Sequence, residues 1–329
     1  MIVSPTADNI RAASKIIVSG GTVVFPTETV YGLGANALDE LAVRKVYALK
    51  SRPIENPLIV HVKDSSQIQL YTDLSDSEVK SRLELLESLW PGPLTVVLPS
   101  NGSIPDIVTA KQPTIAVRVP AHPVAQELLN ECRVPIAAPS ANPSSALSPT
   151  SAEHIASELK ADIILDGGRS KVGIESTIIA LIGPVPLLLR PGSLTVEELQ
   201  EVLKEEIADV SESPLHIEGE SLISPGMLPK HYSPRTPLIF IRDFNPSGQR
   251  SKRVGYIGFK APPEPDQFDY AASMVLSSNG DMQQVAANLY AALHDMDGRS
   301  LDLIVIDDCE RSGIGKAIMN RLSRAVSQK

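Results

Sequence analysis

A stretch without hydrophobic periodicity, residues 207–236, most constrains how this chain of 329 residues can fold. It contains four prolines with several serines and glycines, a composition typical of a linker. At about 30 residues it is longer than ordinary connections, which indicates either function or disorder. Because a single hydrophobic core seldom grows past ~250 residues, two domains are expected, residues 1–206 and 237–329, joined by this linker.

Residues 1–206 mix strands and helices without strict alternation. Helices are expected over residues 6–19, 40–49, 75–89, 123–132, 151–159 and 195–202, and strands over 22–25, 57–62, 94–98, 114–118, 136–138, 162–165, 176–180 and 186–189. The run PTETVYGLGAN, residues 26–36, is rich in turn residues and is not expected to form a regular strand. The pattern predicts an α/β domain on a twisted mixed sheet, not a doubly wound one.

A second rhythm follows the linker. Strands are expected over residues 238–244 and 253–259, an extended segment over 268–276, a helix over 282–296, a strand over 303–307 and a helix over 314–326. Strands that alternate with amphipathic helices predict a small parallel α/β domain of Rossmann-like character.

Composition excludes several classes of protein. The net charge of −9 weighs against a protein whose main task is to coat nucleic acid, since such binding neutralises phosphates with Lys and Arg. No run approaches the ~20 apolar residues of a membrane span, and the first residues do not resemble a signal peptide, so a soluble, unexported protein is expected. Cys132 and Cys309 lie far apart without CxxC spacing, which suits reduced thiols in the cytoplasm. Nucleophile-elbow, HExxH, Cys/His-cluster and Walker patterns are absent from the sequence.

Four cations stand at the ends of expected elements. Lys50 and Arg52 follow a helix, where they either complement the helix dipole or bind phosphate. Arg118 ends an apolar strand, and its partner is either a protein carboxylate or a ligand. Arg190 ends another strand in the same way. Cations at strand and helix ends are suited to an anionic ligand, but neither alternative is decided by these segments.

Small polar residues accompany the cations. His61 stands in an apolar strand, either as a core histidine or as a hydrogen-bonding partner of a substrate. Ser140 and Asn142 lie between two prolines and are candidates for ligand contacts, while Thr150 or Ser151 is expected to cap a helix. Ser176 opens a strand in the motif GIEST.

Taken in order, the motifs PTETVYGLG, KSRP with PLIVHV, AVRVP, SAN, SPT, GIEST, LRPG and SPGMLPKHYSP resemble the YrdC/Sua5 family of threonylcarbamoyl-AMP synthases. The resemblance covers roughly the first 235 residues, and the remainder is similar to the additional domain of the longer Sua5 type. It implies a nucleotidyltransferase that uses L-threonine, bicarbonate and ATP to make L-threonylcarbamoyladenylate and diphosphate. This is the first step of the threonylcarbamoyladenosine (t6A37) modification of tRNA.

The resemblance also implies roles for individual residues. Lys50 and Arg52 are expected to be catalytic, and the expected threonine contacts are Thr29, His61, Arg118, Ser140 and Ser176. The expected ATP contacts are Arg52, Asn56, Thr114, Asn142, Ser148, Thr150, Arg190 and Tyr232. Mg²⁺ is expected with ATP, without a nominated protein ligand. A downstream threonylcarbamoyl transferase complex is the implied recipient of the product, and a weak RNA contact stays open.

Two motifs need separate comment. The linker motif with Lys230 and Tyr232 is expected to close over ATP as a lid. At Ser145 this chain departs from the family, which commonly has glycine there, so the local turn is expected to differ.

Two other functions share some of these features. One is an RNA-binding module, which would show strong salt dependence and no ATP consumption. The other is the carbamoyl-transfer domain of a maturation enzyme, but such proteins usually carry zinc-finger cysteines and an acylphosphatase segment, and neither occurs in this sequence.

Overall fold

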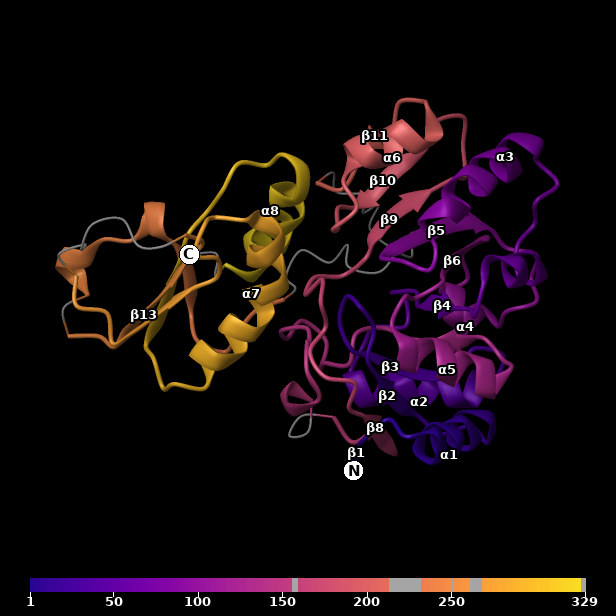
Figure 1. Cartoon of the computed structure of the whole chain (residues 1–329), viewed down its shortest axis with the longest axis horizontal. Coiled ribbons are helices and arrows are strands. Elements are labelled where there is room, and N and C mark those ends of the chain that lie inside the picture. Colours follow the sequence, from indigo (N-terminus) through magenta and orange to yellow (C-terminus); the bar gives the residue numbers. More distant parts are fainter. Residues whose placement is uncertain (156–158, 213–231, 250, 261–267, 327–329) are drawn as a thin grey trace.

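In the computed structural model of the chain, the strands before and after the linker form two separate sheets (Figure 1). The structure describes residues 1–155, 159–212, 232–249, 251–260 and 268–326. Most of the linker, including Lys230 and the greater part of the lid motif, lies outside the described residues, so the expected lid stays a prediction.

The first domain is built on a mixed sheet. Its strands are β1 (Ile2–Val3), β2 (Val23–Phe25), β3 (Gly32–Asn36), β4 (Ile59–His61), β5 (Leu94–Pro99), β6 (Thr114–Arg118), β7 (Ile136–Ala137), β8 (Ile163–Leu165), β9 (Thr177–Ala180), β10 (Leu187–Arg190) and β11 (Ala208–Asp209). Among the described residues they lie in the order β1-β8-β2-β3-β7-β4-β6-β5-β9-β10-β11. The sheet contains both parallel pairs, such as β4 with β6, and antiparallel pairs, such as β5 with β6, so the mixed sheet is confirmed. Because β11 pairs with β10, this sheet extends beyond residue 206.

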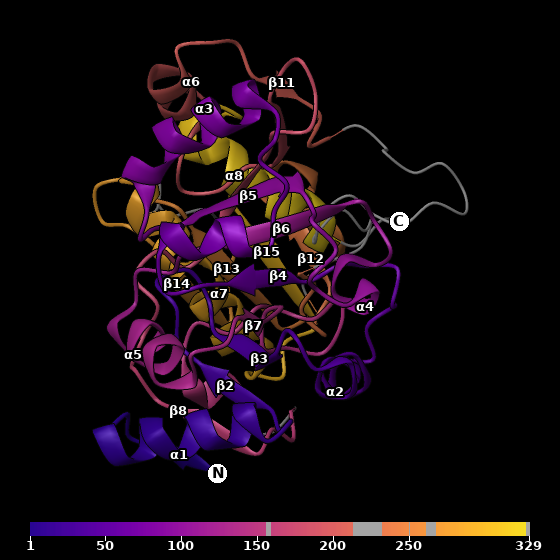
Figure 2. The same cartoon turned by 90° about the vertical axis from the view of Figure 1, so that its right-hand side faces the viewer.

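Helices cover both ends of the sheet. They are α1 (Ala7–Val18), α2 (Glu40–Lys50), α3 (Ser77–Leu86), the short α4 (Asp106–Thr109), α5 (Pro123–Cys132) and α6 (Val196–Leu203). Helix α1 packs against α5, and α3 packs against α6 at the opposite end of the domain (Figure 2). Thr195 caps α6 in a reciprocal capping box with Glu198, which gives partners to two backbone N–H groups that would otherwise be unpaired.

The expectation that residues 26–36 contain no regular strand is wrong for its second half. Gly32–Asn36 forms β3, antiparallel to β2. Glycine is depleted in most strands, but here it is required by packing, because a Cβ on Gly34 would lie 2.6 Å from Ile136 Cγ2 and 2.7 Å from Phe25 Cε1. The glycines therefore let β3 lie close to the aromatic ring of Phe25.

The helix expected over residues 151–159 is also corrected. Its described part contains a 3-10 turn, Ala152–His154, and residues 156–158 lie outside the described chain. The carbonyl of Thr150 accepts a hydrogen bond from the backbone of Ser170 (2.8 Å), and Ser151 makes no side-chain capping bond. The Thr150 carbonyl is therefore bonded to a neighbouring loop, whereas in a regular helix it would accept a hydrogen bond from the following turn of the same segment.

The second domain is a small parallel sheet with two helices. Its strands are β12 (Leu238–Phe240), β13 (Val254–Gly258), β14 (Ala272–Val275) and β15 (Leu303–Ile306), in the order β12-β15-β13-β14, and its helices are α7 (Met282–Asp297) and α8 (Gly313–Ala325). All pairs in this sheet are parallel, which confirms the Rossmann-like character. The first strand is shorter than expected, because the chain turns into a 3-10 segment at Ile241–Asp243.

Helices α7 and α8 lie on the side of the second sheet that faces the first domain (Figure 1). Three apolar residues of the first domain, Val30, Leu147 and Ile174, belong to the same buried cluster as the apolar residues of these helices. The domains therefore share hydrophobic packing. None of the helices in the described parts of the chain is long and apolar enough to cross a membrane.

Candidate active site

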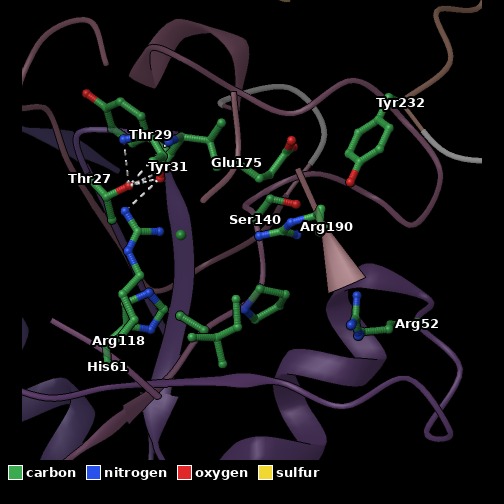
Figure 3. A pocket seen from close by; sticks show the side chains of 15 residues that line it. Thr27, Thr29, Tyr31, Arg52, His61, Arg118, Ser140, Glu175, Arg190 and Tyr232 are labelled. Atoms are coloured by element: carbon green, nitrogen blue, oxygen red, sulfur yellow. Dashed lines mark hydrogen bonds between the residues drawn. The ribbon is translucent and has the colours of Figure 1, made fainter. Parts of the chain in front are cut away.

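A pocket lies in the first domain where strand ends and loops meet (Figure 3). The pairing of β4 with β6 places His61 directly beside Arg118, and Arg190 comes from the end of β10. The lining residues are Thr27, Thr29, Val30, Tyr31, Gly32, Arg52, Ile59, His61, Arg118, Ala138, Pro139, Ser140, Glu175, Arg190 and Tyr232. Figure 3 shows the threonines, His61 and Arg118 on one side, Arg52 and Tyr232 on the other, and Ser140 and Arg190 between them.

Arg118 is buried and partly paired. One of its terminal nitrogens lies 2.6 Å from a carboxylate oxygen of Glu28 and 2.9 Å from the hydroxyl of Thr29. Burial disfavours the charged form of Glu28, but the charge of Arg118 outweighs this and holds the pKa of Glu28 below its usual value. The buried Nε of Arg118 has no partner among the described residues. Arg118 therefore pairs with a protein carboxylate, and its Nε remains as a donor for a ligand.

His61 combines the two roles that the sequence left open. Its side chain is buried on β4, with its ring edge-on to Phe25 at a centroid distance of 6.0 Å, and it also lines the pocket. Burial, reinforced by the nearby charge of Arg118, lowers the pKa of His61 to about 3. The imidazole is therefore neutral at physiological pH. Its Nδ1 has no partner among the described residues and can serve as a hydrogen-bonding group for a ligand.

Lys50 does not line the pocket. Its side chain is buried, and its ammonium donates to the carbonyls of Ser140 (2.6 Å) and Asn142. Burial lowers the pKa of Lys50 well below its usual value, and the charge of Arg52 adds to this. Lys50 therefore fixes the loop that carries the SAN motif, residues 140–142 (the SAN loop), from outside the pocket. Ser140 of this loop lines the pocket.

Arg52 and Asn56 form one unit on the far side of the pocket. The guanidinium of Arg52 donates to the Asn56 side-chain oxygen (2.6 Å) and to the carbonyls of Asn56 (3.0 Å) and Pro57 (2.7 Å). Burial lowers the pKa of Arg52 to about 10, so it still carries its charge near neutral pH. Carbonyl partners orient a guanidinium without neutralising it, which leaves its charge available to an anion.

Arg190 is oriented in a comparable way. Its Nε donates to the carbonyl of Ser176 and its terminal nitrogen to the hydroxyl of Ser176, both at 3.0 Å. That hydroxyl also lies 2.8 Å from the hydroxyl of Thr95 on β5. Through the Ser176 hydroxyl, the guanidinium of Arg190 is therefore linked to β5.

Charges in and beside the pocket do not balance. Glu28 pairs with Arg118, and Glu175 pairs with Arg321 of α8 (Nε–Oε2 2.8 Å). The charges of Arg52 and Arg190 are left without a carboxylate salt-bridge partner among the described residues. Two uncompensated buried cations favour an anionic ligand.

Seven of the expected contacts line the pocket: Thr29, Arg52, His61, Arg118, Ser140, Arg190 and Tyr232. Asn56 and Ser176 contact lining arginines, and Ser148 donates to Glu175 at 2.5 Å. Asn142 donates to the carbonyls of Pro143 and Ala146, and Thr150 is buried with no partner for its hydroxyl among the described residues. Thr114 lies at the opposite end of β6 from Arg118. The ligand roles of these residues stay predictions.

Among the residues in or beside the pocket that were not proposed from the sequence, three are charged: Glu28, Glu175 and Arg321. Glu28 and Glu175 stand inside the motifs PTETVYG and GIEST, so their positions were a usable signal. Arg321 lies in the second domain, where no sequence motif indicated it. The described residues contain no group of three or more His, Cys, Asp or Glu side chains suited to a metal ion.

The fold and the pocket define a two-domain α/β protein with a cationic ligand site in its first domain. The sequence pattern described as "Telomere recombination" (Sua5_yciO_yrdC) matches residues 15–192, and that described as "Threonylcarbamoyl-AMP synthase, C-terminal domain" (Sua5_C) matches residues 194–327. The chain belongs to the Sua5/YciO/YrdC family, and it has the additional Sua5 domain.

Several relatives are similar over nearly the whole chain. A threonylcarbamoyl-AMP synthase of Pyrococcus abyssi is 39% identical over 334 residues, which cover 96% of this chain and 93% of the relative. The Bacillus subtilis threonylcarbamoyl-AMP synthase is 38% identical, with 96% of this chain and 92% of the relative covered. The crystal structure of P. abyssi Sua5 complexed with L-threonine superposes with a TM-score of 0.88 at 37% identity, over 99% of both chains.

Proposed function

We propose that the protein is an L-threonylcarbamoyladenylate synthase, which uses L-threonine, bicarbonate and ATP and releases diphosphate. The observation that carries the proposal is the two-sided pocket. One side offers the neutral imidazole of His61 and the guanidinium of Arg118, which pairs with one carboxylate and keeps an unpaired Nε, and these groups suit a small amino acid. The other side offers Arg52 and Arg190, which have no carboxylate partner among the described residues. The similarity to P. abyssi Sua5, a protein crystallised with L-threonine, supports the same function.

On the threonine side, Arg118 binds the substrate carboxylate through its unpaired Nε, and neutral His61 accepts or donates a hydrogen bond. Thr29 and Ser140 supply hydroxyl groups for the remaining polar atoms of threonine, whereas Ser176, whose hydroxyl is bonded to Arg190 and Thr95, orients Arg190. A site built to satisfy a hydroxyl discriminates against analogues that lack it, because its own buried polar groups would be left unpaired.

On the ATP side, Arg52 and Arg190 bind phosphate oxygens. Asn56, Thr114, Asn142, Ser148, Thr150 and Tyr232 complete the nucleotide contacts or support the loops that make them. Lys50 acts by fixing the carbonyls of Ser140 and Asn142, so that the SAN loop presents its side chains to both substrates. Mg²⁺ bound to ATP would neutralise part of the phosphate charge; because the described residues contain no group of three or more His, Cys, Asp or Glu suited to a metal ion, phosphates and waters would supply most of its ligands.

The reaction follows from these placements. The ammonium group of threonine loses a proton, and the resulting amine condenses with bicarbonate with loss of water, which gives N-carboxythreonine as its carbamate anion. An oxygen of this carbamate attacks the α-phosphorus of ATP, the bond from the α-phosphorus to the bridging oxygen breaks, and diphosphate leaves with that electron pair. Arg52 and Arg190 stabilise the charge that develops on the leaving group, and the pocket holds both reactants in line. No protein nucleophile is required.

Diphosphate release measured with each substrate omitted in turn tests the proposal. Release is expected only with threonine, bicarbonate and ATP together, and Arg52→Ala or Arg190→Ala is expected to lower kcat/KM by at least about 100-fold, because each removes a charge-stabilising donor. Arg44→Ala, at an exposed arginine on α2, is the matched control and is expected to retain activity. Release that is equal with and without threonine would contradict the proposal.

The product is an activated, hydrolysable mixed anhydride, so an acyl-transfer enzyme acting on tRNA must consume it. We place the protein in the cytoplasm on this basis, where a threonylcarbamoyl transferase complex is its downstream partner. A weak contact with RNA is testable through salt-dependent tRNA binding.

A further inference from the structure

A buried ion pair joins the two domains directly behind the pocket. Arg321 of α8 is fully buried, and its Nε lies 2.8 Å from Oε2 of Glu175, which lines the pocket. The same carboxylate accepts hydrogen bonds from Ser148 (2.5 Å) and from Tyr290 of α7 (3.1 Å). Glu175 therefore receives partners from both domains.

Arg321 also holds the backbone on two sides of the pocket. One terminal nitrogen donates to the carbonyl of Glu175 (3.2 Å), and the other donates to the carbonyl of Pro191 (2.7 Å). These carbonyls immediately flank Ser176 and Arg190, which are themselves hydrogen-bonded to each other. One side chain of the second domain thus links the ends of β9 and β10, from which the ATP side of the pocket is built.

Its other neighbours lie on the same side of the site. The guanidinium of Arg321 stacks over the ring of Tyr232 at 5.5 Å from its centroid. Tyr232 lines the pocket, and Ser148 donates a hydrogen bond to Glu175, the carboxylate that pairs with Arg321. By contrast, none of the hydrogen bonds that Arg321 makes within the described residues reaches Arg118, Thr29 or His61 on the threonine side.

The charges show why the pair is needed. Burial alone would favour a protonated Glu175, but Arg321 first and Arg190 next reverse this and lower the pKa of Glu175 to about 2. Without Arg321, the carboxylate would be left with Arg190 as its nearest cation, and it would compete with the ATP phosphates for that guanidinium. A buried carboxylate that has lost its partner is costly, so the surrounding loops would rearrange.

We propose that Arg321 is a positioning residue for the ATP side of the active site, which is incomplete without the second domain. This inference rests on the proposed function. Arg321 occupies Glu175, keeps Arg190 available for phosphate, and fixes the Glu175 and Pro191 carbonyls around Ser176.

The test is steady-state diphosphate release by the full chain, with ATP and threonine varied separately. Arg321→Met, which keeps most of the side-chain volume, is expected to raise KM for ATP by at least about tenfold and KM for threonine by less than about threefold. Adding Glu175→Gln to Arg321→Met removes the unpaired charge and is expected to recover at least about threefold of the loss. A purely structural role would lower the amount of folded enzyme, without this split between the two KM values.

Lys316→Met is the matched control. Lys316 lies on the same helix and also pairs across the domains, with Asp209 at β11, but neither residue lines the pocket. It is expected to leave KM for ATP within about twofold of the wild-type value. An equal effect of Lys316→Met and Arg321→Met would overturn the proposal, since it would assign the effect to domain docking in general.

A conservative change covers the case in which Arg321→Met does not fold. Arg321→Lys keeps the charge but cannot donate to Glu175 and Pro191 together, so KM for ATP is expected to rise by about fivefold. A wild-type KM in Arg321→Lys, or in folded Arg321→Met, would overturn the proposal while wild-type activity still upheld the proposed function. Absence of threonine-dependent release in the wild type would instead reject the proposed function.

Discussion

Ser145 occupies a backbone conformation that normally favours glycine, with a φ of 71°. The sequence indicated a local difference at this residue, where the family commonly has glycine. The turn is nevertheless left-handed, and the Ser145 carbonyl accepts a hydrogen bond from the backbone of Ser233 (3.0 Å), beside Tyr232. The serine therefore bears backbone strain at a position that helps to hold the pocket wall.

Ser145→Gly is expected to stabilise the protein by up to about 1 kcal/mol, because it removes the cost of a left-handed residue with a Cβ, less the greater entropy of glycine in the unfolded chain. Urea unfolding of the two proteins measures the difference. Ser144→Gly, at the neighbouring residue, is the control and is expected to destabilise, because its φ is not positive. Equal losses in both variants would contradict the interpretation.

His61 gives a pH dependence at the residue scale. Its pKa is about 3 in the folded protein, against an ordinary value of 6.5, so between these values the unfolded chain binds the proton more tightly. Its contribution to stability is fully present above pH 6.5 and is lost as the pH falls towards 3. The loss amounts to about 2 kcal/mol by pH 5, since each pH unit below the unfolded pKa is worth about 1.4 kcal/mol.

The free energy of unfolding of wild type and His61→Gln at pH 7 and pH 5 checks this prediction. His154, whose pKa burial lowers to about 4, contributes in the same direction in both proteins and cancels in the comparison. The wild type is expected to lose more stability than His61→Gln over this range. Parallel losses would show that His61 titrates normally in the folded state.

Strand β3 gives a prediction at the scale of elements. Gly34→Ala is expected to destabilise the protein by about 1–3 kcal/mol, because its Cβ would meet side-chain atoms of Ile136 and Phe25 at 2.6 and 2.7 Å. Gly183→Ala is the control, since a Cβ there meets no atom within 4 Å, and a change within about 0.5 kcal/mol is expected. Thermal unfolding measures both variants. A Gly34→Ala variant as stable as Gly183→Ala would refute the packing argument.

Most elements could be predicted from local patterns. Helix α5 and strand β6 have the expected bounds, because apolar spacing and strong end signals act within one segment. Strand β3 could not be predicted in this way, since the reason for its glycines is the ring of Phe25 on another strand. The 3-10 turn at Ala152–His154 depends on a backbone contact with Ser170, which is equally non-local.

The candidate site divides along the same line. Residues that carry their chemistry in a local motif, such as Arg52 and Arg118, were found from strand and helix ends and from the resemblance. Lys50 was expected to act on substrate, but local sequence does not show that its ammonium reaches the SAN loop. Arg321 could not be found, because its relation to Glu175 exists only after the two domains have packed together.

At the scale of the whole molecule, the GIEST loop is pressed against the second domain. Gly173 has a φ of +77°, and a Cβ there would lie 2.5 Å from the Cα of Ala287 on α7. The next residues, Ile174 and Glu175, enter the shared apolar cluster and the ion pair with Arg321. Close approach of a helix backbone therefore determines where Glu175 stands in the pocket.

Gly173→Ala is expected to separate this contact and so to weaken both stability and ATP use. Gly168→Ala is the matched control, because Gly168 has a φ of +79° but a Cβ on it meets no atom within 4 Å. Both variants bear the same left-handed strain, so the additional loss in Gly173→Ala, about 1–3 kcal/mol in the free energy of unfolding, reports the clash with α7. KM for ATP is expected to rise in Gly173→Ala alone. If the two variants lose equal stability and keep equal KM values for ATP, then contact between the GIEST loop and α7 does not position the active site.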